Sequence, residues 1–190
     1  MISVLDDPAV RARVYPMRVE AYHRLFDLGQ ITEKLELLRG AIVEKMPKAP
    51  LHASIVTHLF RYLLARVPPG WEVRSEQPIT FAALDSEPEP DLAVSRGTAE
   101  DFFQSHPSTA ALVIEVCVSS EAIDRLKLQI YAEAGVAECW LILAEQRVME
   151  RHTEPQGAAY QRIERVTFPA ALESTVFPGL TLPPAGLFPA

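Results

Sequence analysis

The chain has 190 residues, of which 48% are hydrophobic, so it is long enough for one sizeable core and too short for two comfortable domains. Its 25 Asp and Glu residues outnumber its 18 Lys and Arg residues, and the net charge of −7 argues against a protein that holds nucleic acid by a basic surface alone. No apolar run approaches the roughly 20 residues of a membrane span. The acidic start also lacks the apolar segment of a secretory signal. We therefore expect a cytoplasmic protein with no membrane partner.

The hydrophobic pattern of the first half predicts alternating helices and strands. Helical spacing of apolar residues ends at Gly29 in one segment and before Pro68–Pro69–Gly70 in another. Polarity alternates on both sides of Arg39–Gly40, which is typical of a β-hairpin. In chain order we predict a helix over 18–28, a hairpin of 34–38 and 41–46, a helix over 51–67, strands over 71–75, 78–82 and 91–95, and a brief helix over 98–105.

The second half contains the strongest pattern, a stretch without proline between Pro107 and Pro155. An apolar run over 111–117 and another over 138–143 predict buried strands, and the segment 121–134 between them predicts a helix. A strand, a helix and a strand in this space form a βαβ unit. Further strands are expected over 147–153 and 160–166. The fold class is therefore α/β, with a mixed central β-sheet flanked by helices.

We place no domain boundary in this sequence. There is no internal repeat, and the only segment that resembles a linker is the proline-rich end. We expect one domain over 1–190, with a core over about 18–152 and a strap over about 169–190 that lies on the domain or forms a loose tail.

Two acidic residues and a lysine are the first candidates for chemistry. Glu115 is the only charged residue in the run 111–117, and a carboxylate in a buried strand is costly unless it is paired, protonated or bound to a metal. Asp91 opens the strand 91–95, and if the two strands are neighbours, both acids lie at one edge of a cleft. Such oxygens suit Mg²⁺ or Mn²⁺. Lys127 lies beside the predicted core stripe of its helix, on the same side as Asp124 and Tyr131.

The predicted core stripe of this helix is a set of four apolar residues, Ile123, Leu126, Ile130 and Ala134. For each polar candidate an ordinary structural role is the alternative: a solvated strand end for Glu115, and an ion pair with Asp124 for Lys127.

Three segments of the sequence resemble the Uma-two family of endonucleases in the restriction-endonuclease-like PD-(D/E)xK superfamily: EPEPDLAV, ALVIEVCVSS and DRLKLQIYAEAGVAECWLI. The resemblance covers about residues 18–145. It implies a core of αβββαβ order, with Asp91 and Glu115 as metal ligands and Lys127 as the third catalytic residue. It also implies DNA as the substrate and Mg²⁺ or Mn²⁺ as the cofactor. A homodimer is one option, because cutting two strands needs two sites.

Two features depart from the superfamily pattern. The usual lysine two positions after the glutamate is replaced by Cys117, and Lys127 matches the lysine that the family carries on the following helix. Asp124 and Lys127 are three residues apart where four is expected, although both spacings keep them on one side of a helix. His52 matches a histidine of the family, and we predict a structural role at its helix start, with Glu44 or Gln77 near it if it reaches the cleft.

The sequence is compatible with three functions. The first is hydrolysis of phosphodiester bonds in DNA with a divalent metal, which would polarise the phosphate and acidify a bound water. The second is a catalytically inactive binding or interaction module with the same fold, which Cys117 and the acidic net charge favour. The third is hydrolysis of another substrate by an acid pair such as Glu87 and Glu115, for which the sequence has no sugar- or peptide-binding signature.

Overall fold

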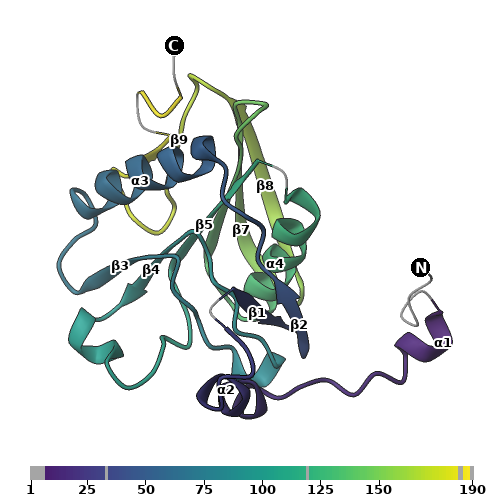
Figure 1. Ribbon diagram of the computed structural model, residues 1–190. Helices are drawn as coiled ribbons and strands as arrows, with labels where there is room; N and C mark the ends of the chain where they lie inside the picture. Colours follow the sequence, from purple (N-terminus) through teal and green to yellow (C-terminus); the bar gives the residue numbers. More distant parts are fainter. Residues whose placement is uncertain (1–6, 33, 119, 184–185, 189–190) are drawn as a thin grey trace.

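A computed structural model of the chain describes residues 7–32, 34–118, 120–183 and 186–188. Its centre is a six-stranded sheet in the order β3-β4-β5-β6-β7-β8 (Figure 1). Neighbours β5 and β6 run parallel, and the other neighbouring pairs run antiparallel. Two small ribbons, β1–β2 and β9–β10, lie outside this sheet. The mixed α/β class predicted from the sequence is confirmed.

The bounds of the elements follow the hydrophobic pattern closely. The helices are α1 (Pro8–Arg11), α2 (Val19–Asp27), α3 (Pro50–Leu64) and α4 (Glu121–Glu133), with short 3₁₀ turns η2 (Ala82–Leu84) and η3 (Ala99–Phe102). The strands are β1 (Leu35–Leu38), β2 (Ala41–Glu44), β3 (Trp71–Ser75), β4 (Leu92–Arg96), β5 (Leu112–Cys117), β6 (Glu138–Leu143), β7 (Val148–Gln156), β8 (Ala159–Thr167), β9 (Leu172–Glu173) and β10 (Thr181–Leu182). The run from α3 to β6 has the expected αβββαβ order.

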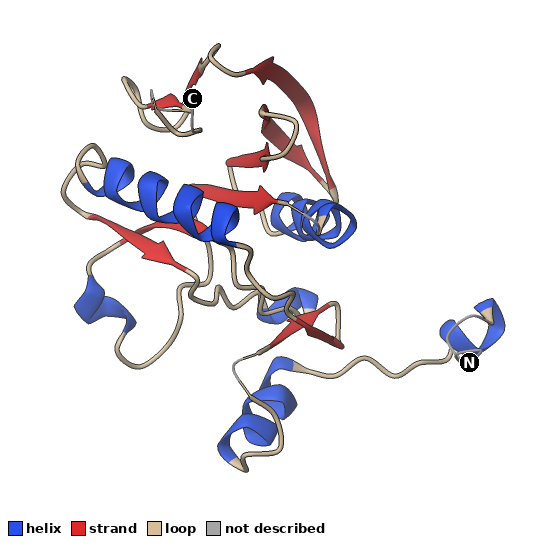
Figure 2. Ribbon diagram, turned by 45° about the horizontal axis from the view of Figure 1, so that its top comes forward, coloured by secondary structure: helices blue, strands red, loops and turns tan. Residues whose placement is uncertain are grey.

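The two faces of the sheet are covered by different helices. Beneath α3 the sheet buries the β5 side chains Leu112, Ile114 and Val116, and beneath α4 it buries Val113 and Cys117. Because successive side chains of a strand alternate between faces, Glu115 belongs to the α4 face. Figure 2 shows α3 lying across the strands. This alternation decides which helix can supply partners to Glu115.

The predicted hairpin is the ribbon of β1 and β2. Both turn residues have positive φ, 49° at Arg39 and 75° at Gly40, as a two-residue type I′ turn requires. A Cβ at Gly40 would lie 2.4 Å from the Cβ of Pro16, so only glycine fits this close approach. The amide of Glu87 donates to the carbonyl of Leu37 at 2.7 Å and holds the ribbon beside the main sheet.

The strand predicted over 78–82 is wrong. Residues 77–80 form no ladder, and only an isolated bridge joins Phe81 to Ser86. Amides of this segment find scattered partners instead: Ile79 donates to the carbonyl of Pro88, and Thr80 donates to that of Pro107. Both acceptors are carbonyls of proline residues, which have no N–H to donate in return, so a regular ladder cannot propagate.

The core stripe predicted for the helix 121–134 also needs correction. Leu126 is 37% exposed, whereas Lys127 is 5% exposed, and Asp124 and Tyr131 are buried beside it. Leu128, which the predicted stripe omitted, is buried in the core on this face of the sheet. The helix turns polar groups inward because Glu115 and other carboxylates offer them partners, which an apolar periodicity does not register.

The C-terminal segment packs over the α3 face of the sheet. Its buried side chains in that core are Phe177, Leu180, Leu182, Leu187 and Phe188. Glu138, fully buried at the start of β6, accepts hydrogen bonds from the Thr175 amide at 2.6 Å, the Thr175 hydroxyl and the Trp140 indole. One carboxylate thus ties the segment to the sheet.

We expect Glu138→Ala to lower the free energy of unfolding by on the order of 3 kcal/mol, because it leaves the buried Trp140 indole and the amide and hydroxyl of Thr175 without their carboxylate acceptor. Urea unfolding measures this loss, and limited proteolysis should reveal earlier cleavage within 169–183. Glu138→Gln, which keeps one acceptor oxygen, should lose less. Equal stability of Glu138→Ala and wild type would contradict this role.

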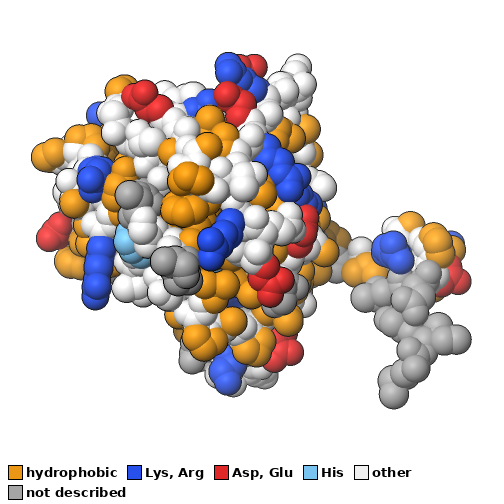
Figure 3. Space-filling view, turned by 90° about the horizontal axis from the view of Figure 1, so that it is seen from above, with side chains coloured by type: hydrophobic (Ala, Val, Ile, Leu, Met, Phe, Trp, Pro, Cys, Tyr) orange, Lys and Arg blue, Asp and Glu red, His pale blue; other side chains and the backbone are white. Residues whose placement is uncertain are grey.

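The N-terminal arm, residues 7–15, stands clear of the body (Figures 1 and 3). All four residues of α1 are exposed, and Tyr15 is 85% exposed. On the face seen in Figure 3, the described Lys, Arg, Asp and Glu side chains are interspersed and form no single basic field. Within the described part of the chain, no helix has the length and apolar character needed to cross a membrane.

Candidate active site

A cavity of about 100 Å³ opens between the end of β2, the first turns of α3 and α4, and the segments of β4 and β5 around Asp91 and Glu115. The predicted site residues that line it are Asp91, Glu115, Lys127, His52, Glu44 and Asp124. These residues come from segments up to 83 positions apart (44 to 127), so only the folded chain gathers them.

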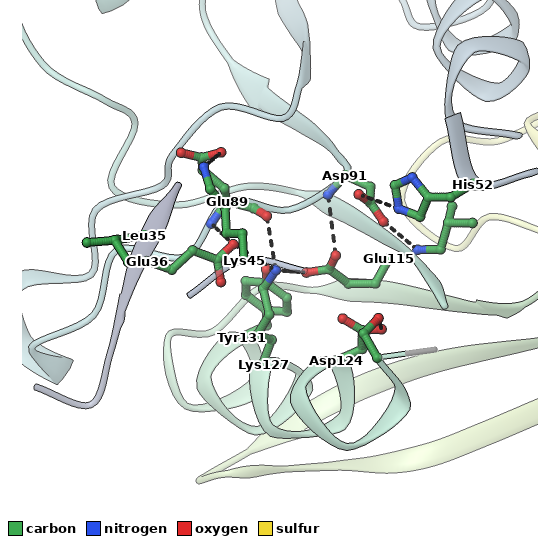
Figure 4. Close-up of polar contacts among 12 residues, drawn as sticks. Leu35, Glu36, Lys45, His52, Glu89, Asp91, Glu115, Asp124, Lys127 and Tyr131 are labelled. Atoms are coloured by element: carbon green, nitrogen blue, oxygen red, sulfur yellow. Dashed lines mark hydrogen bonds and ion pairs between the residues drawn. The ribbon is translucent and has the colours of Figure 1, made fainter. Parts of the chain in front are cut away.

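Asp91, directly before β4, lies beside Glu115 of the neighbouring strand β5. The β4–β5 register pairs Leu92 with Ile114, and one further step sets Asp91 opposite Glu115. The amide of Asp91 donates to Oε2 of Glu115 at 3.3 Å, and the amide of Val116 donates to Oδ2 of Asp91 at 2.7 Å. The two acids therefore meet where β4 begins beside β5, at one end of these interior strands (Figure 4).

Lys127 is buried beneath the cavity among acidic groups. Its Nζ lies 3.0 Å from Oε1 of Glu115 and 3.2 Å from Oε1 of Glu36, and it donates to the carbonyl of Glu89 at 3.0 Å. These three partners match the three N–H bonds of an ammonium group. Burial disfavours the charge, but the carboxylates of Glu115 and Glu36 outweigh burial and raise the pKa of Lys127 above its ordinary value.

Glu115 is 2% exposed, and donors surround its carboxylate. The Tyr131 hydroxyl donates to Oε1 at 2.6 Å, beside the Lys127 contact. Burial raises the pKa of Glu115 to about 8, while the charge of Lys127 acts in the opposite direction. The charge of Lys127 therefore favours the ionised form of Glu115, and a bound cation would favour it further.

His52 reaches the other oxygen of Asp91. It lies in the first turn of α3, and its Nε2 is 3.0 Å from Oδ1 of Asp91. Burial lowers the pKa of His52, but the hydrogen bond and charge of Asp91 outweigh burial, and the net shift is upward. One ligand atom from each of His52, Glu76 and Asp91 lies within 4.8 Å of the other two, so these three side chains can share a cation.

The remaining accessory candidates are distributed around this centre. Glu44 is an exposed residue of the cavity wall. Asp124 accepts a hydrogen bond from the Ser120 hydroxyl at 2.5 Å, and burial raises its pKa. Tyr131 lies below the cavity, against Glu115. Gln77 is exposed and is not one of the described residues that line the cavity.

Three carboxylates of the cavity, those of Glu36, Glu76 and Glu89, were not predicted from the sequence. Glu36 is the only charged residue of the buried strand β1, which is the same signal that identified Glu115. Glu76 directly precedes Gln77, and its φ of 54° breaks the alternation of β3. A pattern of alternating faces therefore could not decide which of these two neighbours reaches Asp91.

Glu87, the other member of the hypothetical acid pair, lies in a separate environment. It accepts a hydrogen bond from the Thr80 hydroxyl at 2.6 Å, and one of its oxygens lies 2.8 Å from Nε2 of His23. This group lines a second hollow, on the side of α2, whereas Glu115 lines the first. The structure does not bring the two acids together.

The family model Uma2, described as "Putative restriction endonuclease", matches residues 19–185. The chain belongs to the Uma2 family. No curated protein sequence matches the chain. The Uma2 match covers both strands that carry Asp91 and Glu115 and the helix that carries Lys127, and it begins after the N-terminal arm.

The fold also resembles a solved structure. A crystal structure of a protein from Anabaena variabilis, described as a putative nuclease belonging to DUF820, superposes with a TM-score of 0.67. The two sequences are 18% identical, and the match covers 86% of this chain and 92% of the other. At this identity the likeness shows a shared fold. Together with the Uma2 match, it supports a nuclease-like function.

Proposed function

We propose that this Uma2 protein is a metal-dependent endonuclease that hydrolyses phosphodiester bonds in DNA. The observation that carries the proposal is the meeting of Asp91 with Glu115, Lys127 and His52 at one cavity. Family membership supplies the reaction class, and the arrangement of these groups supports the metal dependence.

The donor set at the cavity suits a divalent cation. Asp91 has carboxylate oxygens toward both Val116 and His52, and Glu76 and Glu115 stand on either side of it. Carboxylate oxygens and an imidazole nitrogen are ordinary ligands of divalent metals. We assign the metal to Asp91, with Glu115 as the second acid. A bound ion would polarise the scissile phosphate and lower the pKa of a water molecule.

The remaining residues would position the substrate and balance charge. Lys127 is the cation nearest to Glu115, and its ammonium would offset negative charge on a phosphate oxygen. Because its three donors already bind Glu115, Glu36 and the Glu89 carbonyl, a phosphate must replace one of these partners. Tyr131 holds Glu115 in place from below.

The test is cleavage of supercoiled plasmid by the full chain with Mg²⁺ or Mn²⁺. We expect nicked and linear products, no product after chelation with EDTA, and recovery of cleavage when the metal is restored. A matched RNA substrate tests the assignment to DNA. Absence of cleavage with either metal, in protein that remains folded, would overturn the proposed function.

A non-catalytic nucleic-acid-binding module is the second candidate. Cys117 stands where the superfamily carries its lysine, and the buried ion pairs of Lys127 are also what a purely structural lysine would make. Gel-shift binding of DNA without cleavage in either metal would favour this second function over the first.

A further inference from the structure

The side chains of His52 and Glu76 converge on one side of Asp91, away from Lys127. His52 comes from the start of α3, Glu76 follows β3, and Asp91 precedes β4. One ligand atom of each lies within 4.8 Å of the others. Nε2 of His52 lies 3.0 Å from Oδ1 of Asp91. Two ligand atoms that bind one ion at right angles, each about 2.1 Å from it, are about 3.0 Å apart, so this spacing is compatible with a shared ion.

The backbone holds this arrangement in place. The amide of Glu76 donates to the carbonyl of Asp91 at 3.1 Å, so the two carboxylates stay on neighbouring chain segments. Glu76 has a φ of 54°, a left-handed conformation that is uncommon for a glutamate. This turn directs the Glu76 side chain to the same cavity as Asp91 and His52.

Competing partners are weaker here than around Glu115. Glu115 is enclosed by Lys127, Tyr131 and a backbone amide. Glu76 pairs with Lys48 at 2.6 Å, but both side chains are about one-third to one-half exposed, and such ion pairs contribute little. The second ring nitrogen of His52, Nδ1, is buried and has no hydrogen-bond partner in the described chain. His52 and Glu76 can therefore bind a cation with little loss of existing interactions.

We infer that His52 is a metal ligand and that its ring nitrogen makes the site select Mn²⁺ and similar first-row transition ions over Mg²⁺ and Ca²⁺. Imidazole binds transition ions well, whereas Mg²⁺ and Ca²⁺ favour oxygen ligands and water. The inference rests on the proposed function only for the metal's place in the reaction. It adds the class of ion and assigns a ligand role to a histidine for which the sequence predicted a helix-start role.

Metal binding without nucleic acid tests this inference. Titration of the full chain with Mn²⁺, followed by the loss of the free-ion electron paramagnetic resonance signal, gives its Kd, and calorimetry gives the Kd for Mg²⁺. We expect His52→Ala to weaken Mn²⁺ binding at least about tenfold. His52→Asn, which offers an oxygen in place of the nitrogen, should reduce the Mn²⁺ over Mg²⁺ preference by about tenfold. Electron spin echo spectra of bound Mn²⁺ should show ¹⁴N coupling that His52→Asn abolishes.

His58→Ala is the matched control, because His58 is exposed on the same helix. It should keep the wild-type Kd and the ¹⁴N coupling. An unchanged metal preference in His52→Asn, or no ¹⁴N coupling in wild type, overturns the inference even if the protein cleaves DNA. Nitrogen-coordinated Mn²⁺ in a protein that cleaves no nucleic acid would sustain the inference and remove the proposed endonuclease.

Discussion

Asp91→Asn should cut supercoiled plasmid about a thousandfold more slowly than wild type in single-turnover experiments. The substitution keeps the size of the side chain and an oxygen that accepts from the Val116 amide, but it removes the charge that Asp91 offers to His52 and to a cation. A metal ion contributes several kcal/mol to stabilising a phosphoryl transition state, and about 4 kcal/mol corresponds to a thousandfold.

The control for this variant is Glu145→Gln, which removes an exposed carboxylate from the β6–β7 turn. Cleavage by this variant should match wild type, which excludes an effect of overall charge. Circular dichroism should show that Asp91→Asn is folded. If folded Asp91→Asn cleaves at the wild-type rate in Mg²⁺ and Mn²⁺, the catalytic assignment of Asp91 is lost, and a contaminating nuclease becomes the explanation for wild-type cleavage.

The second large effect is expected on stability. Lys127→Met should lower the free energy of unfolding at neutral pH by about 3–5 kcal/mol, because removing one partner of a buried ion pair leaves the others uncompensated. The groups left behind are the carboxylates of Glu115 and Glu36, which are 2% and 5% exposed. Methionine preserves most of the volume, so the loss reports charge rather than a cavity. Urea unfolding followed by tryptophan fluorescence measures it.

A double variant separates the electrostatic cause from a packing defect. Lys127→Met combined with Glu115→Gln removes the uncompensated charge and should recover part of the lost stability, since paired buried charges can be replaced together at small cost. If the double variant is less stable than Lys127→Met by the full cost of Glu115→Gln alone, the two residues are not coupled, and the ion pair does not stabilise the fold.

Much of the fold could be predicted because local patterns and tertiary packing agree. The run 111–117 is apolar because both faces of β5 are covered, and Gly135 ends α4 in a left-handed conformation, with φ of 76°. The two wrong predictions, the strand over 78–82 and the core stripe of α4, have one cause: each depends on partners from distant segments of the chain. Segment 78–82 has a strand-like composition but no neighbouring ladder, and the inner face of α4 contains Lys127 because acids from other elements lie opposite it.

The sequence by itself determined most of the helices and strands between residues 18 and 167, the α/β class and the family resemblance, because these depend on periodicity and on short motifs. It also singled out Asp91, Glu115 and Lys127 as residues of unusual chemistry for their surroundings. Only the tertiary structure decided that Glu36, His52 and Glu76 join them, and that Gln77 and Glu87 do not line the same cavity. These contacts depend on strand register, on a left-handed turn at Glu76 and on the helix that covers each face of the sheet. None of these three features produces a periodic pattern in the sequence.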